Sequence, residues 1–258
     1  MLKRLFNEQP SLMWAGVVSF VLFLVTAVLV FIDPIEILGI NRWIKPMKFF
    51  VSIAIFLWTM AVYFDALPER RNTFRRLSWA MIVIFIIEMA VIVGQPLRGT
   101  TSHFNSSNPF DGALFAAMGI SIAILTLIVA YLTLVFFRSD LSLPPAVAWG
   151  LRLGLLVMLL GSIQGGYMAS QGAHAVGAAD GGAGLPIVNW STEGGDLRVA
   201  HFLGLHGLQA IPIFGLVIDR FQRSGSVALT IGFAAVYTAA FTAVFVQALF
   251  GRPLLALG

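Results

Sequence analysis

The 258-residue chain contains no cysteine. It therefore holds no disulfide, no thiolate-bound metal or iron–sulfur cluster, and no haem attached covalently through a CxxCH motif. Histidine, carboxylate and backbone groups remain as ligands for a metal ion or a non-covalent haem. The chain also lacks a P-loop, a dinucleotide-binding fingerprint and a GxSxG nucleophile elbow.

Charge is also scarce, since only 11% of the residues are Asp, Glu, Lys or Arg while 59% are hydrophobic. This balance excludes an ordinary soluble domain and indicates a multi-pass membrane protein. Sixteen basic residues stand against twelve acidic ones. The small excess does not indicate a nucleic-acid partner, because most of these residues lie in short loops, where they orient membrane helices.

Long apolar runs predict an all-α fold with seven transmembrane helices, and we expect a single helical-bundle domain over residues 1–258. The expected partner of the helix surfaces is the lipid bilayer. The runs lie at about residues 11–32, 46–66, 77–95, 112–137, 146–170, 199–218 and 227–250.

Basic residues predict the orientation of these helices, because cytoplasmic loops carry an excess of Lys and Arg. If the amino terminus is inside, ten basic residues fall on the inner side and six on the outer side. We therefore expect the amino terminus in and the carboxyl terminus out. The inner set is Lys3, Arg4, Arg70, Arg71, Arg75, Arg76, Arg138, Arg152, Arg220 and Arg223, and the outer set is Arg42, Lys45, Lys48, Arg98, Arg198 and Arg252.

The stretch GDLRVAHFLGLHGLQAIP, residues 195–212, opens the sixth predicted span with polar side chains. They are Asp196, Arg198, His201, His206 and Gln209. A charge at the centre of a bilayer costs about 2.5–3.5 kcal/mol on insertion scales, so such residues are candidates for function. The alternative is structural: residues 196–201 lie at the water interface, and His206 and Gln209 form hydrogen bonds between helices.

Several further polar side chains share one depth in the predicted membrane. Counted from the outer helix ends at about 1.5 Å per residue, they lie roughly six to eight residues deep. They are Ser52, Glu88, Gln164 and His206. Gln95 follows Glu88 by seven residues and shares its helix face. We expect Glu88 and His206 to face each other.

Two long connections fall on the outer side. RGTTSHFNSSNPFDG, residues 98–112, concentrates turn formers and side-chain ligands, among them His103 and Asp111. The other connection, residues 171–198, is rich in glycine and predicts either a mobile lid or a spacer. We favour a spacer for its first half and a packed role for WSTEGGDLR.

Histidines close to carboxylates suggest a metal ion, zinc or iron, or a haem. We expect the metal ligands among His103, His201 and His206, and catalytic roles for Glu88, His206 and Asp111. His201 and His206 lie about 140° apart around a regular helix, so they would not chelate one ion together.

The outer cations suggest a second function. They would form a funnel for an anionic solute, a lipid headgroup or a quinone-like ligand, with Glu88 and His206 as a proton relay. Anchoring to lipid phosphates explains each cation taken alone. The predicted ligand-binding residues are Lys45, Lys48, Ser52, Gln95, Arg98, Gln164, Arg198, Gln209 and Arg252.

The segments WIKPMKF, RGTTSHFNSSNPFDG and GDLRVAHFLGLHGLQ resemble an uncharacterised family of bacterial multi-pass inner-membrane proteins. The resemblance implies a bacterial inner membrane but no activity, cofactor or catalytic residue. A weaker similarity links the chain to seven-helix membrane zinc hydrolases of the ceramidase and adiponectin-receptor type, which use a serine, an aspartate and three histidines. It would give these roles to Ser52, Asp111, His103, His201 and His206, although this chain has HFLGLH where those enzymes have HxxxH.

The sequence favours a metal- or haem-dependent membrane enzyme acting on a small or lipid-like substrate. A transporter or binding protein for an anionic solute, lipid or quinone-like ligand is the alternative, and a structural membrane subunit is a third. The sequence leaves the oligomeric state open.

Overall fold

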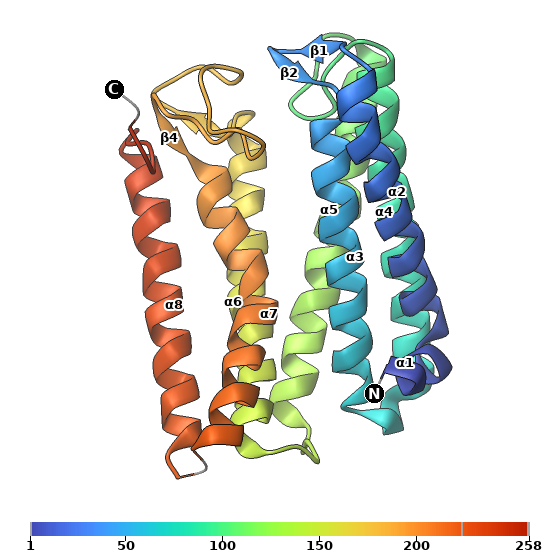
Figure 1. Cartoon of the computed structure of the whole chain (residues 1–258), viewed down its shortest axis with the longest axis vertical. Coiled ribbons are helices and arrows are strands. Elements are labelled where there is room, and N and C mark those ends of the chain that lie inside the picture. Colours follow the sequence, from blue (N-terminus) through green and yellow to red (C-terminus); the bar gives the residue numbers. More distant parts are fainter. Residues whose placement is uncertain (1, 223, 257–258) are drawn as a thin grey trace. The chain divides into compact units, whose positions relative to one another are not determined.

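The computed structural model describes residues 2–222 and 224–256, so Arg223 of the inner basic set lies outside the described residues. Seven described helices are long and apolar enough to cross a membrane (Figure 1). They are α2 (Pro10–Ile32), α3 (Ile44–Asp65), α4 (Arg71–Leu97), α5 (Pro109–Arg138), α6 (Pro145–Gln171), α7 (Leu197–Phe221) and α8 (Ser226–Leu249). The predicted all-α fold with seven membrane-length helices is confirmed.

Local chemistry explains where several helices begin and end. Proline is the first residue of α2, α5 and α6, where its fixed φ suits the helix and its missing N–H has no partner to lose. Gly172 ends α6 with a φ of 68°, a left-handed conformation that glycine adopts without strain. The helix α4 starts six residues before the predicted span, at Arg71, because arginine favours helix and its turn can stay in water.

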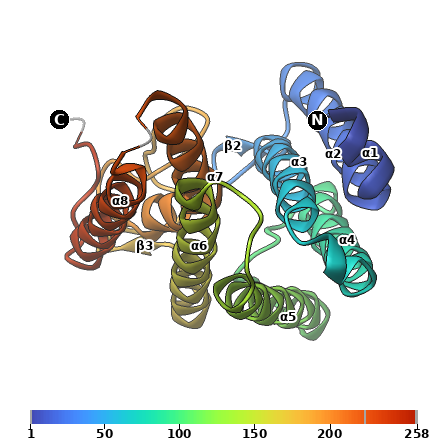
Figure 2. The same cartoon turned by 90° about the horizontal axis from the view of Figure 1, so that it is seen from below.

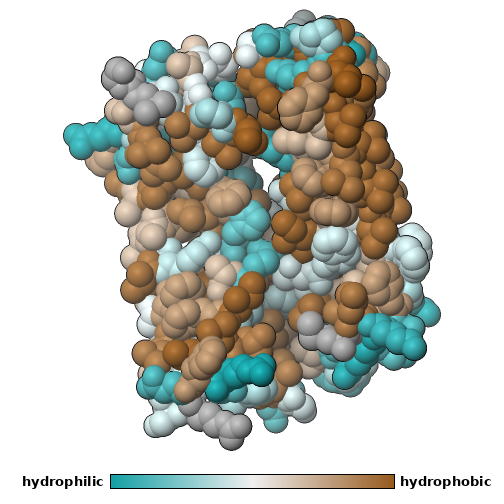
Figure 3. All heavy atoms as spheres, viewed as in Figure 1, coloured by the Kyte–Doolittle hydropathy of each residue, from teal (hydrophilic) through white to brown (hydrophobic). Residues whose placement is uncertain are grey.

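Large apolar side chains lie exposed on the outer surfaces of the helices. Phe31 is 89% exposed, Val236 70% and Leu127 69%. Exposed apolar surface on this scale is unfavourable in water but contacts acyl chains in a bilayer. On the face drawn in Figure 3, apolar residues cover much of the length of the helices α2 to α4, and hydrophilic residues gather near their ends. The chain is therefore an integral, multi-pass membrane protein.

The chain divides into two compact units, Met1–Leu125 and Thr126–Gly258, with the boundary inside α5. Each unit is described by itself, so the expected single domain stays a prediction. Unit 1 contains the short helix α1 (Leu2–Glu8), the helices α2 to α4, the 3-10 turn η1 (Pro68–Arg70) and the first half of α5. Unit 2 contains the second half of α5 and the helices α6 to α8.

In unit 1, α3 lies beside both α2 and α4 (Figure 2). Gly16 of α2 leaves room for the indole of Trp58 of α3, which touches the place a side chain would fill. The Trp58 indole N–H donates a hydrogen bond to the Met13 carbonyl at 3.2 Å. Because Gly16 has no side chain, α2 and α3 can approach each other closely at this point.

A short hairpin, β1 (Glu36–Ile37) with β2 (Ile40–Asn41), joins α2 to α3. Asp33, just before it, accepts hydrogen bonds from the Trp43 indole at 2.7 Å and from Arg42 Nε at 2.8 Å. The hydrogen bond from Trp43, followed by those from Arg42, holds the pKa of Asp33 below its usual value against the opposing effect of burial. Trp43 and Arg42 thus hold the hairpin to the end of α2 through Asp33.

In unit 2, α7 packs against α6 and α8. The α6–α7 contact runs through facing glycines: a Cβ on Gly161 would lie 2.7 Å from the Gly204 backbone. Nearer the beginning of α6, a Cβ on Gly150 would lie 2.8 Å from Pro212 Cα of α7. Backbone therefore packs on backbone, as small residues allow in membrane helices.

The 171–198 connection is folded. Its strand β3 (Ala175–Val176) pairs antiparallel with β4 (Gly195–Asp196). Asp180 accepts the backbone N–H groups of His174 at 3.2 Å and Ala175 at 2.9 Å. Gly195 lies directly against the Ala248 carbonyl of α8. The predicted packing of the WSTEGGDLR end is confirmed, whereas the glycine-rich half is tied down as well and is more than a spacer.

We expect Gly161→Ala to destabilise the protein by about 1–3 kcal/mol, because the added methyl group must push α6 away from α7. Gly166→Ala is the matched control, since Gly166 lies in the same helix with open space at its Cβ position. Unfolding in detergent measures both. Equal stability of the two variants would show that the glycine contact does not hold the helices together.

The predicted orientation places residue 71 inside the cell and residue 106 outside. The cysteine-free chain allows single cysteines at both positions, Arg71→Cys and Ser106→Cys. An impermeant maleimide on intact cells should label position 106, and position 71 only after lysis. Labelling of 71 but not 106 on intact cells would reverse the orientation.

Candidate functional site

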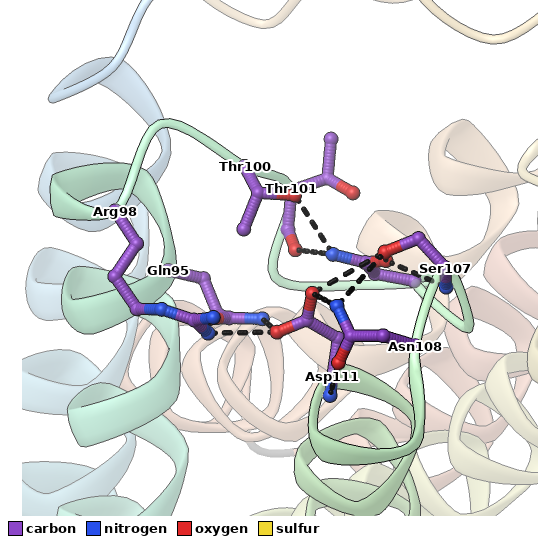
Figure 4. Close-up of polar contacts among 8 residues, drawn as sticks. Gln95, Arg98, Thr100, Thr101, Ser107, Asn108 and Asp111 are labelled. Atoms are coloured by element: carbon purple, nitrogen blue, oxygen red, sulfur yellow. Dashed lines mark hydrogen bonds and ion pairs between the residues drawn. The ribbon is translucent and has the colours of Figure 1, made fainter.

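The 98–108 loop of unit 1 is closed by a network around Asp111, which is 3% exposed. One carboxylate oxygen, Oδ1, accepts hydrogen bonds from Gln95 Nε2 at 2.9 Å and Arg98 Nη1 at 2.7 Å (Figure 4). The other, Oδ2, accepts from Asn108 Nδ2 at 2.7 Å and Ser107 Oγ at 3.3 Å. We call these five residues the loop clasp. Both Asp111 oxygens are occupied, so the geometry gives Asp111 a structural role.

Asn108 was not predicted, although the sequence carries a signal for it. Its side-chain oxygen accepts the backbone N–H of Asp111 at 3.0 Å, while its amide donates to the Asp111 carboxylate. This exchange resembles a capping box, in which a residue before the helix and an acidic residue three positions later satisfy each other. The spacing Asn-Pro-Phe-Asp, with proline at the first helical position, predicts it.

Glu88 of α4 differs from Asp111, because one of its carboxylate oxygens lacks a hydrogen-bond partner among the described residues. It is only 3% exposed, yet its Oε1 atom is buried and accepts no hydrogen bond from the described residues. Buried polar atoms in proteins are normally satisfied, and an unsatisfied one needs an explanation. The positive charge of Lys45 on α3 acts on this carboxylate. Two predicted site residues that lie 43 positions apart in the chain are therefore linked electrostatically in unit 1.

Other predicted residues lie on the same side of α3. Lys48 and Ser52 follow Lys45 by three and seven positions, which places them on one helix face. His103 lies near this face, because its ring is 5.9 Å from that of Phe49, between centroids. Ser102 Oγ is 3.2 Å from His103 Nδ1. We call the Lys45, Lys48 and Ser52 face of α3, with His103 beside it and Glu88 of α4 under the influence of Lys45, the Lys45–Glu88 site.

The two histidines of α7 make contacts within unit 2. His201 Nδ1 lies 2.9 Å from the Gly161 carbonyl of α6, beside the glycine contact. The His206 ring packs 4.3 Å from that of Phe202, between centroids. His201 thus forms the kind of hydrogen bond between helices that the structural alternative expected of His206 and Gln209, whereas for His201 it expected a place at the water interface.

Asp196 and Arg198 form a second network at the start of α7. Arg198 donates to the Asp196 carboxylate from Nε at 2.9 Å and Nη2 at 2.6 Å, and Nη2 also donates to the Asn189 carbonyl. Burial alone would raise the pKa of Asp196, but the hydrogen bonds and charge of Arg198 hold this pKa below its usual value. Arg198 is therefore engaged in holding the 171–198 connection.

Two further predicted residues of unit 2 lie apart from this network. Gln164 donates to the Leu197 carbonyl at 3.1 Å, and its Oε1 is buried without a partner among the described residues. Arg252 is exposed beyond the end of α8. A cavity of about 650 Å³ between α6 and α8 has a lining of apolar side chains and two threonines, so it offers apolar contact and no titratable group.

Within the described residues, 2–222 and 224–256, no three or more His, Asp or Glu side chains come together as metal ligands. The ligand roles expected of His103, His201 and His206 stay predictions, because His103 belongs to unit 1 and the other two belong to unit 2. Comparison with protein families, curated proteins and solved structures finds no match for this chain. This is consistent with a resemblance that carries over no function.

We expect Asp111→Ala to destabilise the protein by about 1–3 kcal/mol, because it leaves the buried Gln95 amide without its acceptor. The control is Asp140→Ala, an exposed aspartate of the α5–α6 connection that should change stability by less than about 0.5 kcal/mol. Unfolding in detergent and proteolysis of the 98–108 loop measure the effect. Unchanged stability and proteolysis in Asp111→Ala would contradict the structural role.

Proposed function

We propose that the protein is a membrane-embedded binding or transport protein for a small anionic or lipid-like ligand. Lys45 and Lys48 hold the negative charge of the ligand, and Glu88 exchanges a proton with it. The observation that carries the proposal is the buried oxygen of Glu88, which has no hydrogen-bond partner among the described residues, in a carboxylate on which the positive charge of Lys45 acts. The fully bonded Asp111 of the same unit shows by contrast how this fold satisfies a carboxylate whose role is structural.

The charges explain why binding of the anion and of a proton should be linked. An isolated ionised carboxylate in an apolar interior is costly, so Glu88 needs either a nearby cation or a proton. Lys45 supplies the cation while the site is empty of ligand. When a ligand anion pairs with the Lys45 ammonium, this cation no longer balances the charge of Glu88. The net charge of the site then stays the same if Glu88 binds a proton. Anion and proton then bind together, as in a proton-coupled carrier.

The pairing of Glu88 with His206 in a proton relay stays a prediction, because the two residues belong to units that are described separately. Location in a bacterial inner membrane, with the amino terminus inside, is part of the same proposal. It rests on the sequence resemblance and on the distribution of basic residues.

The metal- or haem-dependent enzyme also stays a prediction, and no cluster of ligands among the described residues favours it. Its test is direct. A Soret band, or zinc or iron bound in stoichiometric amount to the purified protein, would favour the enzyme over the carrier.

We expect proteoliposomes of the wild-type protein to take up protons when phosphate, sulfate or succinate is added outside, as reported by a trapped pH-sensitive dye. Glu88→Gln should abolish proton uptake, since an amide cannot exchange the proton. Lys45→Gln should weaken the response about tenfold or more, because loss of a charge-assisted contact lowers affinity by that order.

Lys3→Gln is the matched control, because Lys3 is an exposed lysine of α1 outside the Lys45–Glu88 site. It should behave as wild type. Proton uptake that survives in Glu88→Gln, or a wild-type protein that responds to none of the anions, would refute the proposal.

A further inference from the structure

A polar cavity in unit 1 is lined by residues of α1 and of the adjoining ends of α3 and α4. Figure 1 shows α1 at the end of the unit opposite the β1–β2 hairpin. The volume of the cavity is about 350 Å³, which is at the small end of the range for ligand pockets. The lining residues are Arg4, Glu8, Gln9, Phe64, Asp65, Pro68 and Arg71. None of them belongs to the Lys45–Glu88 site.

Two ion pairs line this cavity. The helix α1 supplies the basic residue of one pair and the acidic residue of the other. Arg4 Nη2 lies 3.1 Å from Asp65 Oδ1, and Arg71 Nη1 lies 3.1 Å from Glu8 Oε2. Each pair joins α1 to the α3–α4 end of the unit. The two arginine side chains are 64% and 61% exposed, so their remaining N–H donors can reach a ligand.

The charges of the cavity sum to zero, and this selects the kind of ligand. A simple anion would meet two carboxylates as well as two guanidinium groups, and a simple cation would meet the reverse. A zwitterion gives every group an opposite charge. A phosphate accepts hydrogen bonds from arginine, often two at once, while a primary ammonium donates to the carboxylates.

The position of the cavity indicates that the zwitterion is a lipid headgroup. Its residues lie at the ends of three membrane-length helices, since α2 begins at Pro10, α3 ends at Asp65 and the third span begins at Pro68. This is the depth of lipid headgroups. Trp14, 60% exposed, packs its ring on Phe6 near this end, as aromatic residues do at membrane interfaces.

We propose that this cavity binds the headgroup of a zwitterionic phospholipid with a primary amine, such as phosphatidylethanolamine. The phosphate lies between Arg4 and Arg71, and the ammonium lies between Glu8 and Asp65. The buried ring of Phe64, 1% exposed and stacked on Phe74 at 4.2 Å, forms a rigid apolar wall beside the charges.

Native mass spectrometry of the full chain in detergent tests this, with phosphatidylethanolamine, phosphatidylcholine and phosphatidylglycerol of identical acyl chains added in equal amounts. The wild-type protein should retain one phosphatidylethanolamine about tenfold in preference to phosphatidylcholine, whose quaternary ammonium cannot donate hydrogen bonds. Equal retention of the three lipids, or preference for phosphatidylglycerol as on an ordinary basic surface, overturns the proposal.

Paired variants separate the charge chemistry from simple loss of folding. Glu8→Gln with Asp65→Asn should switch the preference to phosphatidylglycerol, because the arginines remain without their carboxylates. Arg4→Gln with Arg71→Gln should lose retention of all three lipids. The control, Glu69→Gln with Arg70→Gln, changes exposed charges of η1 that do not line the cavity and should behave as wild type. A carboxylate double variant that keeps the wild-type preference overturns the proposal.

A competition with free phosphoethanolamine identifies the source of the headgroup. The soluble compound at the same concentration should not displace the lipid, because it lacks the acyl chains. Displacement by it would overturn the lipid assignment. These outcomes are independent of proton uptake at Glu88, so either proposal can fail without the other.

Discussion

Polar groups inside a bilayer must find their hydrogen-bond partners within the protein, because lipid offers none. Hydroxyl groups in the long helices meet this demand locally. Ser78, Thr133 and Thr230 each donate to the carbonyl four residues earlier, at 2.8, 2.8 and 2.9 Å. Longer side chains need a neighbouring element: the Gln95 amide donates to Asp111 in the loop clasp, and the Gln164 amide N–H donates to the Leu197 carbonyl at the start of α7. The buried Oε1 atoms of Gln164 and Glu88 both lack a hydrogen-bond partner among the described residues, but that of Gln164 belongs to a neutral amide, whereas that of Glu88 belongs to an ionisable carboxyl group.

The same demand explains how the helices approach one another. Apolar side chains gain little by moving from lipid to another helix, so close packing and hydrogen bonds decide the contact. Gly161 and Gly204 let α6 and α7 touch through their backbones, and this closeness brings His201 to the Gly161 carbonyl. A histidine that suggests metal chemistry in the sequence thus has a packing role in the structure. Arg198, a predicted ligand-binding residue, likewise makes its hydrogen bonds within the protein, to the Asp196 carboxylate.

Two different uses of charge therefore occur in unit 1. The Lys45–Glu88 site holds a buried carboxylate within a membrane-length helix under the influence of the Lys45 charge, which suits exchange of a proton and an anion. The cavity at the other end balances two arginines with two carboxylates at headgroup depth, which suits a zwitterion that stays in place. We infer that the first is the working site and that the second fixes α1 and the ends of α3 and α4 to the surrounding lipid.

The amino-acid sequence by itself determined the membrane class and the seven helices, because apolar runs of membrane length leave the backbone no other way to satisfy its hydrogen bonds. It also contained the Asn108-to-Asp111 capping pattern, since capping depends on residues three positions apart. Only the tertiary structure decided which polar residues are satisfied. Glu88 and Asp111 are both acids within membrane-length helices, yet Asp111 is bonded on both oxygens, whereas Glu88 has a buried oxygen with no partner among the described residues. Sequence spacing gives the depth of a side chain along its own helix, whereas its partners depend on how neighbouring helices pack and turn their faces toward it.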